Sequence, residues 1–136
     1  MRQRICALVV GIGDYVHSSK LPNAVNDALT IKRLLEAAGV KVFYIENCYK
    51  HEFESIAKEF RDSIRENDGV IFFFAGHGVE FNNVNRLMTL SKSNSGEPSY
   101  TQDAINLLSL LFRLVTQVVA RAVLTLLMIH HVNMQN

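Results

Sequence analysis

One predicted strand constrains the fold of this chain more than any other feature of the sequence. Residues 70–75 are Val-Ile-Phe-Phe-Phe-Ala, with no polar side chain on either face. A strand of this kind must be covered on both sides, which is typical of a parallel sheet with helices packed on both faces. The segment therefore predicts a layered α/β fold.

The preceding segments fit that fold because they alternate between apolar runs and amphipathic stretches. Two further strands are expected at residues 5–10 and 40–45, and helices at about 24–38 and 51–67, with a third from about Asp103. Apolar spacings of three and four predict the inner faces of the first two helices, formed by Ala24, Ala28, Ile31, Leu34 and Leu35, and by Phe53, Ile56, Ala57, Phe60 and Ile64. We expect Asn23 to cap the first helix and Gly39 to end it in the left-handed conformation. The order of elements predicts a three-layer α/β/α sandwich with a mostly parallel sheet.

The composition argues against nucleic-acid binding, a metal site and a membrane-spanning helix. The chain has 136 residues, enough for one domain, and a net charge of +1, which gives no reason to expect nucleic-acid binding. Two cysteines, Cys6 and Cys48, have neither the number nor the spacing of a disulfide framework or a zinc site, so we expect a reducing, cytoplasmic location, no metal and no cofactor. Residues 105–129 are mostly apolar, but Arg113 and Arg121 argue against a membrane-spanning helix.

The segment Gly76-His77-Gly78 directly follows the apolar strand. Catalytic groups of open parallel sheets gather beyond the carboxyl ends of the strands. We expect the strand to end at Ala75 and the two glycines to allow a sharp turn. This turn would place His77 at the edge of the sheet, where it could act as a general base. The Gly78 amide could then donate a hydrogen bond to an oxyanion. The alternative is that His77 only occupies a turn.

Three segments together resemble the large-subunit portion, p20, of the caspase, metacaspase and paracaspase superfamily. They are Ala7-Leu-Val-Val-Gly-Ile-Gly-Asp-Tyr15, Leu21-Pro-Asn-Ala-Val-Asn-Asp-Ala28 and Phe72-Phe-Phe-Ala-Gly-His-Gly-Val-Glu80. The resemblance implies a cysteine-type endopeptidase domain at residues 4–115 and a divergent C-terminal segment at 116–136. It also implies that His77 is the base that pairs with a cysteine and that Gly78 contributes to the oxyanion hole.

The cysteine that this family uses has no counterpart in the sequence. The family places it after the next strand, within Asp-Ala-Cys-Arg, but the corresponding segment here is Leu126-Leu-Met-Ile-His-His-Val-Asn133, with Val132 at the expected position of the thiol. Cys6 lies within the first predicted strand and Cys48 follows the second, so neither is expected to attack a substrate. We therefore expect a domain that is truncated before its nucleophile.

Asp27 matches the position at which metacaspases and paracaspases have an acidic residue of the first specificity pocket. Such a carboxylate would favour a basic side chain of a peptide or protein substrate; the alternative is an aspartate that stabilises the first turn of a helix. Asp14 and Tyr15 are expected in a loop that borders the cleft without contacting substrate.

Two functions remain open at this point. One is a cysteine endopeptidase domain that is inactive alone, and the other is a catalytically dead interaction module. Self-association through an exposed edge of the sheet is also expected.

Overall fold

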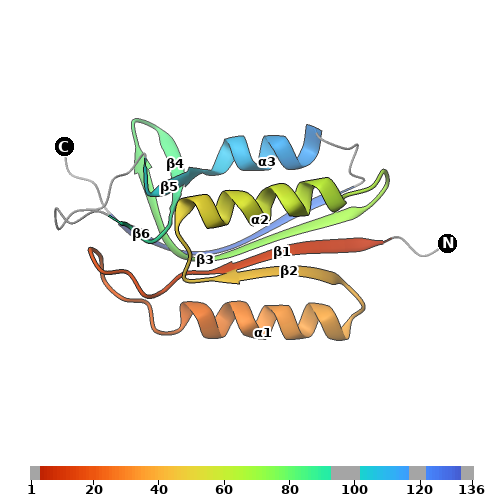
Figure 1. Ribbon diagram of the computed structural model, residues 1–136, viewed down its shortest axis with the longest axis horizontal. Helices are drawn as coiled ribbons and strands as arrows, with labels where there is room; N and C mark the ends of the chain where they lie inside the picture. Colours follow the sequence, from red (N-terminus) through yellow and green to blue (C-terminus); the bar gives the residue numbers. More distant parts are fainter. Residues whose placement is uncertain (1–3, 93–101, 117–121, 133–136) are drawn as a thin grey trace.

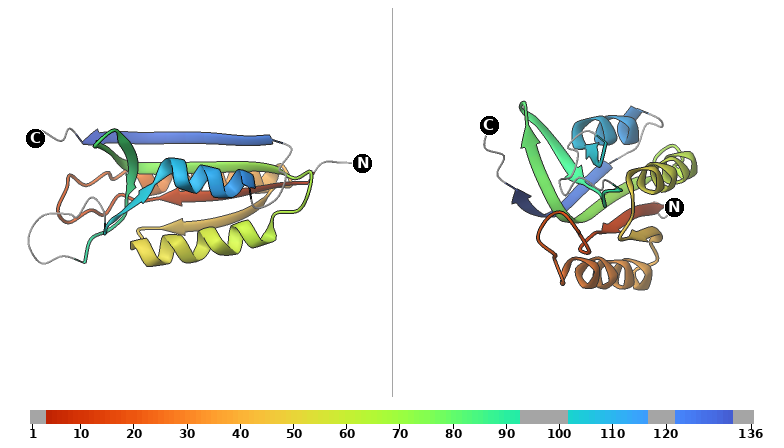
Figure 2. Two further views of the ribbon diagram at one scale, coloured as in Figure 1. Left: turned by 90° about the horizontal axis from the view of Figure 1, so that it is seen from above. Right: turned by 60° about the vertical axis from the view of Figure 1, so that its left-hand side comes forward.

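The computed structural model describes residues 4–92, 102–116 and 122–132 (Figure 1). Its six-stranded sheet has the order β2-β1-β3-β4-β5, and β6 pairs with β3 outside this path. The strands are β1 (Ile5–Gly11), β2 (Lys41–Glu46), β3 (Gly69–Phe81), β4 (Val84–Met88), β5 (Ala104–Asn106) and β6 (Ala122–Val132); the helices are α1 (Ala24–Ala37), α2 (Lys50–Ser63) and α3 (Leu107–Thr116). Helix α1 covers one face of the sheet, and α2 and α3 cover the other (Figures 1 and 2). The predicted three-layer α/β/α architecture is confirmed.

The sheet is mixed rather than wholly parallel. β1, β2, β3 and β6 run in the same direction, with β1 beside both β2 and β3 and with β6 beside β3. β4 is antiparallel to β3, and β5 is antiparallel to β4. Neither β4 nor β5 was predicted from the sequence, because both strands are short and lack a long apolar run.

β3 is much longer than the sequence predicted. It continues from Gly69 to Phe81 instead of ending at Ala75. The expectation of a sharp turn at the two glycines is therefore wrong. β1 lies beside β3 only as far as Gly11, which is level with Ala75, and beyond that point β4 and β6 supply the pairing. The neighbouring strands keep the backbone extended through His77.

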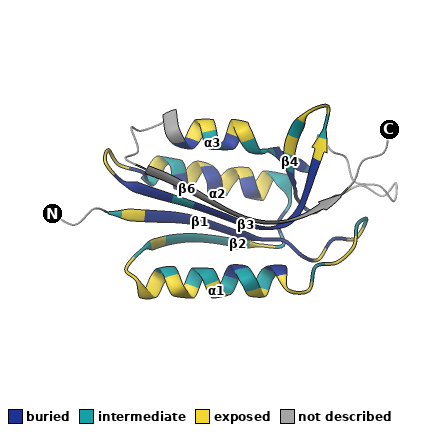
Figure 3. Cartoon of the chain, turned by 180° about the vertical axis from the view of Figure 1, so that it is seen from behind, coloured by how far each residue is buried: buried dark blue, intermediate teal, exposed yellow. Residues whose placement is uncertain are grey.

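Two hydrophobic cores hold the three layers together. The larger core packs α2 and α3 against one face of the sheet, and its largest fully buried side chains include Leu8, Phe53, Phe60, Phe72 and Phe74. The smaller core lies under α1 and contains Ala7, Val9, Ala24, Ala28, Phe73 and Ala75. Buried residues accordingly run along both faces of β1 and β3, while the outer faces of the helices are exposed (Figure 3).

The small residues of the α1 core allow the helix to lie close to the sheet. A Cβ at Gly11 would lie 2.6 Å from the Cβ of Ala28, so only glycine fits at the end of β1.

Leu34, which was expected on the inner face of α1, is 62% exposed, because that face is narrower than the apolar pattern suggested. Asn23 is the N-cap residue but its side chain makes no capping hydrogen bond, whereas Gly39 has the expected positive φ of 85°.

The apolar segment 105–129 does not form one helix. Its described parts belong to β5, to the ten-residue helix α3 and to β6. Within the described residues, no helix has the length and apolar character needed to cross a membrane.

An ion pair that the sequence did not reveal ties the start of β1 to the turn before β3. A guanidinium nitrogen of Arg4 lies 2.6 Å from the carboxylate of Asp68, and the Arg65 amide donates to the same carboxylate at 2.7 Å. Asp68 is buried, and the hydrogen bond from Arg4 lowers the pKa of its carboxyl group. The contact joins segments that are 64 residues apart in the chain.

We predict that Asp68→Asn lowers the free energy of unfolding by about 1–3 kcal/mol at pH 7, because it removes a charged acceptor from a buried site. The folded-state pKa of Asp68 lies below its ordinary value of 3.8. The stabilisation should therefore be complete above about pH 5 and disappear as the pH falls through that lowered pKa. Urea unfolding at several pH values measures the difference.

The matched control is Asp62→Asn, which removes an exposed pair with Lys58 on α2. It should change the free energy of unfolding by less than about 0.5 kcal/mol. Equal effects of the two substitutions would contradict the importance of the Arg4–Asp68 contact.

Candidate functional site

His77 lies in β3 at the level where β1 has already ended, and the loop that follows β1 covers it. The side chain is only 1% exposed. Its backbone amide donates to the hydroxyl of Tyr15 at 3.0 Å. The loop returns to the start of α1 at the carboxyl edge of the parallel strands (Figure 1). His77 thus lies just beyond the level at which β1 ends, within a strand rather than in a turn.

The contacts of the imidazole identify which nitrogen holds the proton. Nε2 of His77 lies 2.6 Å from the carbonyl oxygen of Ser19. A carbonyl oxygen only accepts hydrogen bonds, so Nε2 is the protonated nitrogen. In the neutral tautomer that this contact selects, Nδ1 is the nitrogen with the lone pair. The Ser19 carbonyl therefore fixes the orientation of the imidazole.

Tyr15 fixes the backbone on which the imidazole is built. Its hydroxyl accepts from the His77 amide and donates to the carbonyl of Met88 at 2.8 Å, and its ring centroid lies 4.5 Å from that of His77. A Cβ at Gly76 would lie 2.7 Å from the Tyr15 oxygen, which explains the need for glycine there. Burial raises the pKa of Tyr15, so the hydroxyl remains a donor at neutral pH.

Tyr15 is closer to His77 than its sequence position suggested, and its partners could not be predicted from the sequence. Tyr15 was expected in a loop at the border of the cleft, but it is buried beside His77. Ser19 and Met88 contribute backbone carbonyls, and any residue type offers a carbonyl, so no sequence signal marks either of them. A buried hydroxyl needs a partner, and a tyrosine directly after the Gly11-Ile-Gly13 segment was the available signal.

Gly78 is paired on both sides, and this restricts the role expected for its amide. It lies opposite Leu87 of β4 and opposite His131 of β6. The Ala75 carbonyl accepts from Ile12 at 2.8 Å, and the His77 amide also points to the β1 side. Backbone groups alternate along a strand, so the Gly78 amide points toward β6. An oxyanion could reach this amide only if β6 moved away from it.

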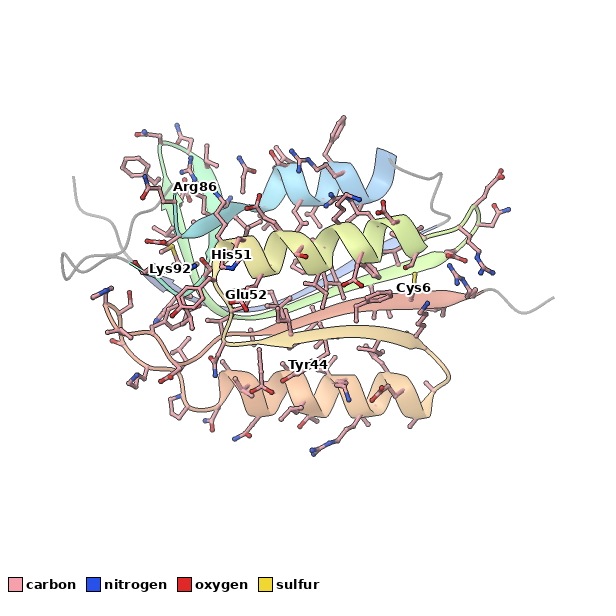
Figure 4. All side chains as sticks on the ribbon, in the orientation of Figure 1. Cys6, Tyr44, His51, Glu52, Arg86 and Lys92 are labelled. Carbon is pink, nitrogen blue, oxygen red and sulfur yellow. The ribbon has the colours of Figure 1, made fainter. Side chains whose placement is uncertain are left out.

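Neither thiol is activated to attack a substrate, although Cys48 lies near Tyr15 of the loop that covers His77. Cys6 is level with Val70 of β3, seven residues before His77 and thus about 23 Å away along the strand; Figure 4 shows it toward the opposite end of β1 from the loop that covers His77. Cys48 is closer to that loop but 1% exposed, and burial raises the pKa of its thiol to about 12. Burial also raises the pKa of Cys6. Both are free, protonated thiols inside the larger core.

β6 lies where the expected nucleophile strand should be, immediately beside β3 and parallel to it. Its register places His130 opposite His77 and Val132 opposite Val79. Val132, the predicted counterpart of the missing cysteine, is therefore two positions beyond the residue that lies level with the base.

Asp27 lies in the first turn of α1, half-buried, and its amide donates to the Asn23 carbonyl at 2.9 Å. This turn packs near Gly11 at the end of β1, so Asp27 belongs to the same edge of the sheet as His77. That position is compatible with both roles expected for Asp27, a carboxylate of the specificity pocket and an aspartate that stabilises the helix.

Among the described residues, no three His, Cys, Asp or Glu side chains are close enough together to hold a metal ion.

The sequence and the fold are similar to those of known proteins. The model of the caspase domain, peptidase family C14, matches residues 4–123. Among solved structures, the chain is similar to protein GSU0716 from Geobacter sulfurreducens, with a TM-score of 0.66 and 13% sequence identity, a likeness that shows the fold alone. It covers 91% of this chain and 48% of GSU0716, so the chain spans about half the length of that protein. No curated protein matches the sequence.

We predict that Tyr15→Phe lowers the free energy of unfolding by about 1–3 kcal/mol, because the His77 amide and the Met88 carbonyl both lose a buried partner. The imidazole resonances of His77 should shift in NMR spectra as its backbone is released. Urea unfolding and a histidine-labelled sample measure the two effects.

Tyr44→Phe is the matched control. Among the described residues, the buried hydroxyl of Tyr44 has no hydrogen-bond partner; burial and the nearby Glu46 raise its pKa to about 12. Tyr44 lies on β2 beneath α1 (Figure 4), level with Val9 of β1, whereas His77 lies beyond the end of β1. Its loss should be neutral or slightly stabilising, and a Tyr15→Phe chain that behaves in the same way would contradict the role of Tyr15.

Proposed function

The chain belongs to the caspase domain family, and on this basis we propose that it is the histidine-bearing part of a cysteine endopeptidase fold that does not cleave peptides by itself. One observation supports the proposal above all others. His77 is oriented as a general base by the Ser19 carbonyl, whereas both thiols of the chain are buried and their pKa values are raised. The base is present and the nucleophile is not.

The chemistry of the family explains why both groups are needed. A cysteine peptidase transfers the thiol proton to histidine, the thiolate attacks the scissile carbonyl, and backbone amides stabilise the resulting oxyanion. In this chain Nδ1 of His77 would receive the proton, because Nε2 already donates to Ser19. A thiolate is the attacking species, and a thiol with a pKa of about 12, as in Cys48, is almost wholly protonated near pH 7.

The site is also closed to a substrate in the present conformation. His77 is almost fully buried beneath the loop that follows β1, and the Gly78 amide is directed toward β6. These two features support a domain that positions a base without completing an active site. Peptide binding without cleavage at the same edge is the alternative, and Asp27 is the residue through which we propose it would select a ligand.

We predict that peptides ending in arginine bind about tenfold more tightly than their citrulline analogues if Asp27 is a specificity carboxylate. The difference should vanish in Asp27→Asn, because the amide has no charge to pair with the guanidinium. It should persist in Glu36→Gln, which removes a carboxylate from the far end of the same helix. Isothermal titration gives the affinities. Equal binding of the two peptides by the parent chain would leave Asp27 with only a structural role in α1.

We predict no hydrolysis of arginyl, lysyl or aspartyl reporter peptides by the unmodified chain. Val132→Cys should restore little, because residue 132 is level with Val79 rather than with His77 and because His130 and His131 occupy the positions of the small and acidic residues that precede the family's cysteine. At pH 8 a thiol reagent should label Cys6 and Cys48 slowly in the folded chain and completely after denaturation.

His77→Ala tests the origin of any activity that is observed, and His51→Ala, an exposed histidine at the start of α2 (Figure 4), is the matched control. Turnover that is lost only in His77→Ala, in a protein that circular dichroism shows to be folded, would overturn the proposal. Rapid labelling of Cys48 in the same chain would then identify the attacking group.

A further inference from the structure

The loop that follows β1, residues 12–23, begins where β1 loses its partner on the β2 side. β1 and β2 are aligned only as far as Gly11. Successive residues of a strand direct their hydrogen-bonding groups to opposite sides, and the Ile12 amide donates to the Ala75 carbonyl of β3 at 2.8 Å. The next amide, that of Gly13, therefore faces the side of β2, where the ladder of backbone hydrogen bonds has already ended.

Asn47, the residue directly after β2, supplies the acceptor that the backbone of β2 no longer provides. Its side-chain oxygen Oδ1 accepts from the amide of Gly13 at 2.9 Å and from the amide of Asp14 at 3.1 Å. Its own amide donates to the carbonyl of Gly11 at 2.9 Å. The φ of Asn47 is 45°, in the left-handed region that asparagine adopts more readily than most residues. One residue thus attaches the start of the loop to the end of β2.

The loop closes on itself at the point that Asn47 holds. The amide of Leu21 donates to the carbonyl of Gly13 at 2.8 Å. Within the closed segment, Lys20 pairs with Asp14 at 2.7 Å, but both side chains are exposed, so the pair is weak. It also joins two residues of the same loop, and for that reason it cannot fix the loop against the sheet.

The closed segment contains both groups that contact His77. The Tyr15 hydroxyl accepts from the His77 amide, and the Ser19 carbonyl oxygen lies 2.6 Å from Nε2 of the imidazole. A backbone carbonyl has no side-chain torsion to adjust, so its position follows the path of the loop. A shift of the loop at Gly13 would therefore move the group that orients the imidazole.

We propose that Asn47 is a positioning residue for His77, which acts by holding the loop that carries Tyr15 and Ser19. Its functional meaning rests on the proposed role of His77 as a base, but the geometry can be tested without any activity. Peptide hydrolysis by the unmodified chain would contradict the proposed function and would leave the link between Asn47 and His77 in place.

Two substitutions separate the side chain of Asn47 from its backbone conformation. Asn47→Gly keeps the positive φ without strain and removes the acceptor, whereas Asn47→Asp keeps an acceptor oxygen and tolerates the same conformation. We expect the His77 amide to exchange with solvent deuterium about tenfold faster in Asn47→Gly, because two backbone amides lose their partner. Asn47→Asp should restore the exchange rate of the parent chain. NMR-detected hydrogen exchange of the full chain measures both rates.

The imidazole nitrogens of His77 give a readout that a purely structural role of Asn47 would not move. In the parent chain, Nε2 should have the ¹⁵N chemical shift of a protonated nitrogen, because it donates to Ser19. In Asn47→Gly the shifts of the two nitrogens should move toward each other as this contact weakens, and Asn47→Asp should reverse the change. Asn83→Gly is the matched control, since Asn83 is exposed, has a φ of 62° and lies between β3 and β4. It should leave the exchange rate and both nitrogen shifts unchanged.

The unmodified chain provides a test that does not depend on the folding of any variant. The amides of Gly13, Asp14 and His77 should exchange through one local opening, with a lower opening free energy than the amides at the centre of β3. A His77 amide that stays protected while Gly13 exchanges would overturn the proposal. Unchanged exchange and nitrogen shifts of His77 in a folded Asn47→Gly chain, or equal changes in Asn83→Gly, would also overturn it.

Discussion

The structure depends on β3 being buried on both faces and paired on both sides. Its apolar segment contributes to both hydrophobic cores, with Phe72 and Phe74 facing α2 and α3 and with Phe73 facing α1. β1 and β6 flank it along its first half, and β4 takes the place of β1 along the second. A strand in this position has no freedom to bend, so the two glycines beside His77 remain extended. The sheet therefore positions the histidine, and the loops adapt to the sheet.

The site around His77 is assembled from parts of the chain that are distant in sequence. Tyr15 and Ser19 come from the loop after β1, and Met88 comes from the end of β4. The Tyr15 hydroxyl accepts a hydrogen bond from the amide of His77, which is 62 residues away in the sequence. Each of these contacts satisfies a buried polar group, which is a condition for burying it at all. The chain thus fixes the orientation of the His77 imidazole, while both of its thiols are buried.

The edge of the sheet and its two faces are formed by different elements. The carboxyl edge contains His77 and Asp27, and the loop after β1 covers His77. The faces of the sheet are covered by helices instead, with α1 on one side and α2 and α3 on the other.

The sequence by itself determined the alternation of strands and helices, the three layers, and His77 as the residue to examine. These follow from local patterns: the apolar segment at 70–75, the stripes of α1 and α2, and the glycine at 39, whose positive φ the sequence predicted. The lack of a cysteine in residues 126–133 was equally visible.

Tertiary structure alone decided the rest. The length of β3, the burial of Tyr15, the contact of Ser19 with His77 and the Arg4–Asp68 pair all depend on segments that meet only after folding. A strand ends where its neighbours stop pairing with it, and a carbonyl becomes a partner only when the chain brings it within hydrogen-bonding distance. Neither condition leaves a signature in the residues themselves, because backbone groups are common to every residue type.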